Sequence, residues 1–212
     1  MMLSYGKRTA NNALLFLHGY GQSAQNARLL LSQTVSFSTL RDLSLVCFFP
    51  NDDWFSYIDE NSLDYNQESL HNTRKYVHEQ INLLLDAYDK VILMGYSQGA
   101  SVALDAALTF PQVLIPVVAI SGMLLVESVV SPGESYSQIN DVYIAHGTED
   151  PEISLKLANK SFQHTSISQS CYFCGTHWDF WSYTDFSNFI LDSLKQIFVV
   201  NSRAVAQFSQ QK

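Results

Sequence analysis

The stretch VILMGYSQGA, residues 91–100, decides the fold, and the helix-like run SVALDAAL, residues 101–108, follows it directly. Its first four residues are continuously apolar, which is typical of a strand covered on both faces of a parallel sheet. The five residues GYSQG, 95–99, then form a Gly-x-Ser-x-Gly turn between the strand and the helix. A nucleophilic serine at such a turn has a strained backbone, and the flanking glycines leave room for the adjoining strand and helix. We therefore predict that Ser97 is a nucleophile.

Short apolar runs alternate with helix-period stretches along the rest of the chain, as expected for parallel strands joined by covering helices. The runs predicted to be strands are 13–18, 43–49, 90–95, 115–121, 141–146 and 168–173. Two amphipathic stretches, 66–88 and 183–198, are predicted to be long helices. A Gly-x-Ser-x-Gly pattern alone occurs by chance, but in this setting it predicts an α/β-hydrolase fold. We expect a mostly parallel central sheet of about six strands, helices on both faces and no lid domain.

Composition and charge narrow the class of protein. The chain has 212 residues, 47% of them hydrophobic, and no Pro/Gly-rich linker. We expect a single domain over 1–212, with a polar tail at about 200–212 that frays. The formal net charge of −8 excludes a basic surface for nucleic acid. No run reaches the ~20 apolar residues of a membrane span and no signal-peptide pattern is visible, so a cytoplasmic protein is expected.

The three cysteines do not predict a disulfide framework. Cys47 lies in an apolar run, and Cys171 and Cys174 form a C-x-x-C pair. A redox or zinc site is compatible with this pair, but no second pair of ligands has matching spacing. Strand thiols in a reduced compartment are the favoured interpretation, and we expect neither a metal nor a cofactor.

A serine hydroxyl needs a histidine to take its proton, and the histidine needs a carboxylate to fix its tautomer. His177 lies in a loop between the last predicted strand and the final helix. The chain order serine, acid, histidine of α/β-hydrolases places the base at this point. The other histidines occupy helices or strand ends, where surface or structural roles are expected: His18, His71, His78, His146 and His164.

Asp150 is the first candidate for the acid, because it comes directly after a predicted strand and precedes His177 along the chain. Glu149 is its neighbour and a rival, and Asp179 is a second rival that lies two residues after the base. An aspartate before proline also commonly caps a helix, so Asp150 has a structural interpretation beside the catalytic one.

The loop LHGYGQ, residues 17–22, follows the first long strand and can present a backbone amide. In this fold the oxyanion hole combines the amide after the nucleophile with one from this loop, which predicts Gln98 and Tyr20 as the donors. The glycine-rich loop does not complete Gly-x-Gly-x-x-Gly, so a dinucleotide site is discounted.

Four motifs together resemble those of the acyl-protein thioesterase and carboxylesterase family, also called the phospholipase/carboxylesterase family. They are FLHGYG at 16–21, GYSQGA at 95–100, SGML at 121–124 and HGTEDP at 146–151. The pair Trp54 and Phe55 is similar to an aromatic pair before the family's long helix. This resemblance implies a triad of Ser97, Asp150 and His177, with the amides of Tyr20 and Gln98 as oxyanion donors. The chain departs from the pattern at Gln22, where the family usually has an acid, and at Trp178, where small residues are frequent.

These observations predict a serine hydrolase that cleaves carboxylic esters or thioesters, with short-chain esters, lysophospholipids or acylated proteins as the substrate classes. The candidates for an apolar acyl groove are Trp54, Phe55, Met123, Leu124 and Trp178. Each of them is equally compatible with core or surface packing. The alternative hypothesis is a catalytically silent binding protein, because a fold does not determine a function. A serine peptidase on this fold usually needs an extra domain, for which the chain has no room.

Overall fold

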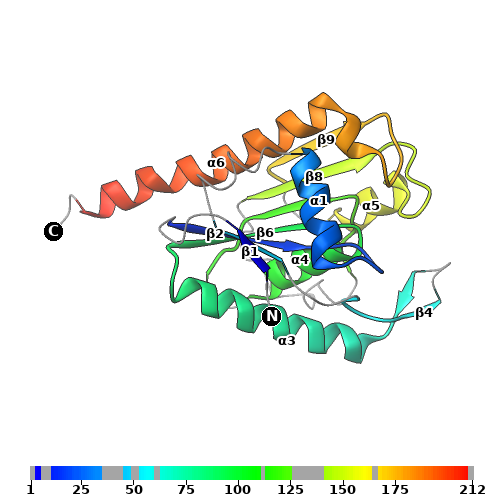
Figure 1. Ribbon diagram of the computed structural model, residues 1–212, viewed down its shortest axis with the longest axis horizontal. Coiled ribbons are helices and arrows are strands. Elements are labelled where there is room, and N and C mark those ends of the chain that lie inside the picture. Colours follow the sequence, from blue (N-terminus) through cyan, green and yellow to red (C-terminus); the bar gives the residue numbers. More distant parts are fainter. Residues whose placement is uncertain are drawn as a thin grey trace.

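One large sheet runs through the centre of the protein (Figure 1). The computed structural model describes residues 3–5, 11–34, 45–48, 53–59, 63–110, 113–125, 141–163 and 167–209. Within these ranges, seven strands pair in the order β1-β3-β2-β6-β7-β8-β9. Their bounds are β1 Leu3–Tyr5, β2 Asn12–Leu17, β3 Leu45–Phe48, β6 Lys90–Tyr96, β7 Val117–Ile120, β8 Val142–Gly147 and β9 Gln169–Phe173. β1 is antiparallel to β3, and the other neighbouring pairs are parallel.

The six predicted strands form the parallel part of this sheet, so the predicted mostly parallel architecture is confirmed. Residues 43, 44 and 49 of the second predicted run lie outside the described ranges. The sequence analysis missed the edge strand β1 and a small antiparallel hairpin of β4 (Tyr57–Asp59) and β5 (Asp64–Tyr65). These strands have two or three residues each, which is too short to show an alternating pattern.

Helices cover both faces of the sheet (Figure 1). Their bounds are α1 Ala24–Thr34, α3 Gln67–Leu85, α4 Gln98–Thr109, α5 Leu155–Ser161 and α6 Thr184–Ser209, with the short 3-10 helix η2 Phe180–Ser182 before α6. One buried cluster joins α3, α4 and α5 to one face, and a second cluster joins α1 and α6 to the other. In β2, Ala13, Leu15 and Leu17 belong to the first cluster, whereas Leu14 and Phe16 belong to the second. Because both faces of the sheet are covered, each buried strand appears in the sequence as a continuous apolar run.

The two long helices match the amphipathic stretches of the sequence. α3 begins after Asn66, whose side chain accepts a 2.9 Å hydrogen bond from the amide of Ser69 and so caps the helix. α6 continues past the predicted end at residue 198 and reaches Ser209. Figure 1 shows its last turns extending away from the sheet. The backbone of 200–209 is thus helical where a fraying tail was expected, and the assignment of 1–212 to one domain stays a prediction.

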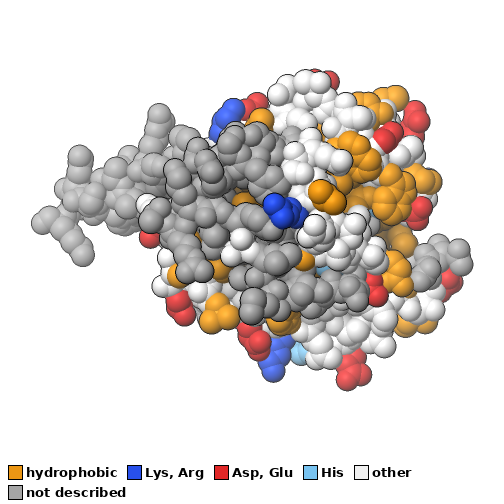
Figure 2. Space-filling model, viewed as in Figure 1, with side chains coloured by type: hydrophobic (Ala, Val, Ile, Leu, Met, Phe, Trp, Pro, Cys, Tyr) orange, Lys and Arg blue, Asp and Glu red, His pale blue; other side chains and the backbone are white. Residues whose placement is uncertain are grey.

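The described surface offers no basic patch on the face drawn in Figure 2. Its few Lys and Arg side chains lie apart from one another among Asp and Glu side chains. This distribution agrees with the formal net charge of −8. Across the helices that the structure describes, none combines the length and the apolar character needed to cross a membrane.

A buried ion pair connects the two helices on one face of the sheet. Arg74 of α3 donates from Nε and Nη2 to the two carboxylate oxygens of Asp105 of α4, at 2.8 and 2.6 Å. The Asp105 carboxylate is fully buried. Its hydrogen bond with the guanidinium raises the pKa of Arg74, against the opposing effect of burial. Because two parallel hydrogen bonds fix the geometry, this pair sets how α3 packs on α4, the helix that begins at the serine.

We expect Asp105→Ala to lower the free energy of unfolding by about 3–5 kcal/mol, because it leaves the Arg74 guanidinium without its buried counter-charge. Urea unfolding followed by circular dichroism measures the change. The matched control is Asp192→Ala, which breaks the exposed Lys195–Asp192 pair and should cost no more than about 1 kcal/mol. Equal losses in the two variants would contradict the structural role of the buried pair.

Candidate active site

The candidate site lies where neighbouring parallel strands end. Ser97 follows β6, Asp150 lies three residues after β8, and His177 lies beyond β9. Tyr20 belongs to the loop after β2, which pairs directly with β6. The carboxyl ends of parallel strands meet at one edge of a sheet, and such an edge is where open α/β sheets bind ligands.

The turn at Ser97 has the strained conformation that the sequence predicts. Ser97 has a φ of 55° and a ψ of −122° between β6 and α4, which is an uncommon conformation for a residue with a Cβ. A Cβ on Gly95 would collide with the backbone of Gly99, and a Cβ on Gly99 would collide with the carbonyl groups of Leu17 and His18. The two glycines therefore allow the strand, the turn and the helix to approach closely enough to hold this strain.

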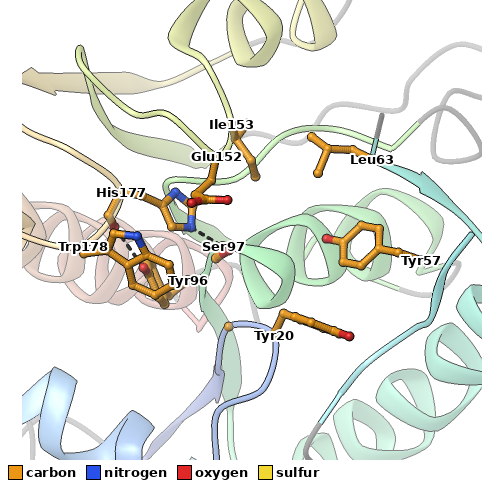
Figure 3. Close-up of a pocket in the computed structure, with 10 residues that line it drawn as sticks. Tyr20, Tyr57, Leu63, Tyr96, Ser97, Glu152, Ile153, His177 and Trp178 are labelled. Atoms are coloured by element: carbon orange, nitrogen blue, oxygen red, sulfur yellow. Dashed lines mark hydrogen bonds between the residues drawn. The ribbon is translucent and has the colours of Figure 1, made fainter. Parts of the chain in front are cut away.

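Ser97, His177 and Asp150 form one hydrogen-bonded chain, and Figure 3 shows the bond between His177 and Ser97. Nδ1 of His177 is 2.7 Å from Oδ2 of Asp150, and Nε2 is 2.8 Å from Oγ of Ser97. A carboxylate can only accept, so Nδ1 carries the proton and Nε2 is free to accept the proton of the serine hydroxyl. His177 and Asp150 are buried, which strengthens the interaction between them.

Asp150 uses its second oxygen to shape the loop that follows. Oδ1 accepts hydrogen bonds from the amides of Glu152 and Ile153, both at 2.9 Å. The helix α5 has Ser154 as its N-cap, so Asp150 closes a turn ahead of the helix and does not cap it. The carboxylate of Asp150 thus orients His177 with one oxygen and organises the loop with the other.

The two rival acids have other partners. Glu149 is exposed and accepts a 3.4 Å hydrogen bond from the thiol of Cys174. Asp179 accepts from the amide and the hydroxyl of Thr176, at 2.7 and 3.0 Å. Both rivals lie in the loops around His177, but the structure places Asp150 against its Nδ1.

Two buried groups hold the backbone around His177 and Asp150. The hydroxyl of Tyr96 donates a 2.9 Å hydrogen bond to the carbonyl of His177. Burial, and to a lesser degree the carboxylates of Asp150 and Glu152, raises the pKa of Tyr96, so the hydroxyl keeps its proton. Nε2 of His146 donates to the carbonyl of Ile153 at 2.7 Å. Burial lowers the pKa of His146, which favours a neutral ring at pH 7.

The remaining histidines lie away from this chain. His18 is fully buried, with its ring centroid 5.1 Å from that of Trp54. His78 is half-buried, and its Nε2 donates to the carbonyl of Ala106 on α4 at 3.1 Å. His78 is therefore packed between α3 and α4 and is not the surface residue that was predicted. His71 is exposed on α3, and His164 lies outside the described residues.

Gln98 connects the start of α4 to the loop at residues 54–55. Its Oε1 accepts from the amide of Trp54 at 3.1 Å, and its Nε2 donates to the carbonyl of Phe55 at 2.8 Å. Its own amide is in the first turn of a helix, where backbone N–H groups have no acceptor within the helix. The side chain of Gln98 therefore organises the neighbouring loop, and its amide stays available as a donor at the start of the helix.

The loop with Tyr20 is held at two amides. Gly19 donates its amide to Oε1 of Gln22 at 3.1 Å, and Gly21 donates to Oδ1 of Asp53 at 2.9 Å. Gln22, one of the departures from the family pattern, thus supports the loop from within. The ring of Tyr20 packs edge-on against Tyr57, with centroids 5.4 Å apart.

A cleft with a volume of about 160 Å³ opens above Ser97 (Figure 3). Its lining residues are Gly19, Tyr20, Tyr57, Leu63, Tyr96, Ser97, Glu152, Ile153, His177 and Trp178. The non-catalytic wall comes from the loop after β2, the region of β4 and β5, the turn after Asp150, and the neighbours of Ser97 and His177. This combination of polar and aromatic side chains around a hydrogen-bonded serine suits a small acyl compound.

Of the five groove residues predicted from the sequence, the structure brings only Trp178 to this cleft. Trp54, Phe55 and Leu124 are buried in the core, and Met123 packs against the same cluster. Trp54 is turned inward because its Nε1 donates to the carbonyl of His18 at 2.8 Å.

The sequence analysis missed six residues that line the cleft: Gly19, Tyr57, Leu63, Tyr96, Glu152 and Ile153. Gly19 and Tyr96 adjoin predicted site residues, and Glu152 and Ile153 follow the acid candidate Asp150 by two and three residues, so nearness along the chain was the available signal. Tyr57 and Leu63 come from the hairpin, for which the sequence shows no local pattern.

Comparisons with known proteins identify the family of the chain. The sequence model of the phospholipase/carboxylesterase family matches residues 2–174. Acyl-protein thioesterase 1 of Kluyveromyces lactis is 27% identical over 197 residues, which cover 82% of this chain and 83% of that protein. Acyl-protein thioesterase 1 of Cryptococcus neoformans is 26% identical over 176 residues, 73% of each chain.

Solved structures show the same fold. A phospholipase/carboxylesterase from Dyadobacter fermentans superposes with a TM-score of 0.68 and 18% identity, over 91% of this chain and 95% of that one. Acyl-protein thioesterase 2 of Zea mays gives a TM-score of 0.68 and 18% identity, over 92% and 99% of the two chains. The α/β-hydrolase fold and the family resemblance are both confirmed. The chain therefore belongs to the phospholipase/carboxylesterase family and is a hydrolase of the carboxylesterase and thioesterase class.

Proposed function

We propose that the protein is a serine hydrolase that cleaves carboxylic esters or thioesters through an acyl-enzyme intermediate. The observation that carries the proposal is the hydrogen-bonded chain from Ser97 through His177 to Asp150, at 2.8 and 2.7 Å, on a strained turn beside a cleft. A nucleophile within reach of a base that is oriented by a third group is the arrangement required for covalent acyl transfer.

In the first half of the reaction, Nε2 of His177 takes the proton of Ser97 as Oγ attacks the acyl carbonyl carbon. The backbone amides of Tyr20 and Gln98 receive the negative charge that develops on the carbonyl oxygen. The His177 imidazolium, stabilised by Asp150, then gives its proton to the departing alcohol or thiol. This step leaves the acyl group esterified to Ser97.

In the second half, His177 removes a proton from a water molecule that attacks the acyl-enzyme. The tetrahedral intermediate uses the same two amides, and the proton on His177 returns to Oγ of Ser97 as the ester bond breaks. A carboxylic acid is released and the starting hydrogen bonds are restored.

The relatives named acyl-protein thioesterases support acyl thioesters on proteins as one substrate class. Tyr57, Leu63 and Ile153 supply apolar surface in the cleft for an acyl chain. Short-chain esters and lysophospholipids fit the same chemistry, and a cytoplasmic location remains part of the proposal.

A fluorophosphonate probe tests the proposal, because an activated serine displaces its fluoride and becomes phosphonylated, and the product mimics the tetrahedral intermediate. We expect wild-type protein to be labelled and Ser97→Ala to be unlabelled. The matched control is Ser101→Ala, one turn further along α4, whose Oγ accepts a 3.2 Å hydrogen bond from the amide of Met123 and which should label like wild type. Folded wild-type protein that takes no label and hydrolyses no ester would instead support the catalytically silent binding protein.

A further inference from the structure

Glu152 places an uncompensated negative charge in the cleft. Its side chain is exposed and lines the cleft together with Ser97 and His177. Its amide donates to Oδ1 of Asp150 at 2.9 Å, so its backbone is fixed relative to the acid. The ion pairs among the described residues leave Glu152 without a basic side chain. Its carboxylate is therefore open to a charged group of a bound ligand.

The position of Glu152 relates this charge to one half of the substrate. Figure 3 shows Glu152 beside His177 on one side of Ser97, with Tyr20 on the opposite side. Its charge also reaches the hydroxyl of Tyr96, which binds the carbonyl of His177. The leaving group departs next to the histidine, since that ring protonates it. Glu152 thus faces the alcohol or thiol half of the substrate rather than the acyl half.

Aromatic rings are also present in this cleft. Tyr20, Tyr57 and Trp178 line the same cleft. The indole of Trp178 lies against the imidazole of His177, with centroids 5.0 Å apart, and is about half exposed. The faces of tyrosine and tryptophan rings attract ammonium groups, and quaternary ammonium ligands are commonly bound by such rings. Among the described residues that line the cleft, none is a Lys or Arg that would oppose a cation.

We propose that Glu152, together with the ring of Trp178, forms a subsite for a positively charged leaving group, so that the enzyme prefers esters or thioesters whose alcohol or thiol carries an ammonium. This inference rests on the proposed function and specifies its substrate class. Glu152 is a specificity-determining residue that takes no part in bond making or breaking. The proton balance of the reaction is unchanged, because His177 still protonates the departing oxygen or sulfur.

Two thioesters of equal shape test the proposal. S-(2-trimethylammonioethyl) thiobutyrate carries a quaternary ammonium on its thiol, and S-(3,3-dimethylbutyl) thiobutyrate has a carbon atom in place of the nitrogen. Release of either thiol is followed with a disulfide reagent, and kcat/KM is compared for the two compounds. We expect wild-type enzyme to prefer the cation by roughly five- to tenfold at low salt, and the preference to shrink at high salt.

Glu152→Gln should bring the ratio of the two kcat/KM values to about one, and Glu152→Lys should reverse the preference, because a cation then faces the substrate's ammonium. The readout for Glu152→Gln is the ratio of the two kcat/KM values, because this side chain lines the cleft that receives both thioesters. The control is Glu79→Gln, which removes one charge from an exposed position on α3 and should leave the ratio unchanged. It separates a local effect from the effect of total charge.

Three results would overturn the subsite. The wild-type enzyme shows no preference for the cation, or Glu152→Gln keeps the preference, or Glu152→Gln slows both thioesters equally and moves the pH profile. The last result would mean that Glu152 acts through His177. In each of these cases fluorophosphonate labelling of Ser97 and hydrolysis of the neutral thioester still stand, so failure of the subsite is distinguishable from failure of the proposed function.

Discussion

Replacing His177 with alanine is expected to lower kcat for an ester or thioester by roughly a million-fold, because His177 is the one described side chain that is hydrogen-bonded to Oγ of Ser97 and can accept its proton. The hydroxyl would remain on its strained turn but as a weak nucleophile. The substrate would still bind, since the cleft walls and the backbone amides do not change. The expected change is therefore in kcat rather than in KM.

Steady-state hydrolysis of a p-nitrophenyl ester measures this effect, together with the rate of fluorophosphonate labelling. Circular dichroism checks that the variant is folded, because His177 is buried and its removal leaves a small space. His71→Ala is the matched control, since His71 is exposed on α3. A His177→Ala enzyme with more than about one hundredth of wild-type kcat would contradict the assignment of the base.

Asp150→Asn is expected to lower kcat by about ten thousand-fold while the loop keeps its shape. The amide oxygen of asparagine can still accept from the amides of Glu152 and Ile153. Its NH₂ group would then face Nδ1 of His177, where Oδ2 now accepts. A donor at this point forces the proton of the imidazole onto Nε2, the atom that must accept from Ser97.

The same assay with Glu149→Gln and Asp179→Asn compares the rival acids. Both variants should retain most of the wild-type kcat, because neither carboxylate is placed against Nδ1 of His177. If Glu149→Gln or Asp179→Asn lost more activity than Asp150→Asn, the third member of the hydrogen-bonded chain would have to be reassigned. Urea unfolding of the three variants separates a loss of activity from a loss of stability.

The parts of the fold that were predictable share one property: their signal is local. The run at 91–100 contains the strand, the strained turn and the start of the helix in ten consecutive residues. Continuous apolar strands and amphipathic helices are likewise visible within windows of a few turns. Asp150 and His177 were placed by chain order, because the ends of successive parallel strands meet at one edge of the sheet.

The walls of the cleft were not predictable in the same way. The sequence shows that Trp54 and Phe55 are apolar, but it does not show that they face the core. Their position is fixed by hydrogen bonds to Gln98 and His18, which are far away in the sequence. Leu63 lies in the cleft from a turn where its φ is 59°. Such a conformation depends on tertiary contacts, and the presence of a leucine does not predict it.

The side chain of Gln98 joins two parts of the molecule, the turn that carries the serine and the region that shapes the cleft. On one side are the turn with Ser97 and the edge of the sheet, where even one added methyl group meets backbone. On the other side is the hairpin at 57–65, which shapes the cleft and is joined to the turn through two hydrogen bonds at residues 54–55. Because these bonds use only backbone atoms of the loop, the anchor itself does not depend on which side chains the loop carries. One primary amide thereby couples the position of the cleft wall to the position of the reacting serine.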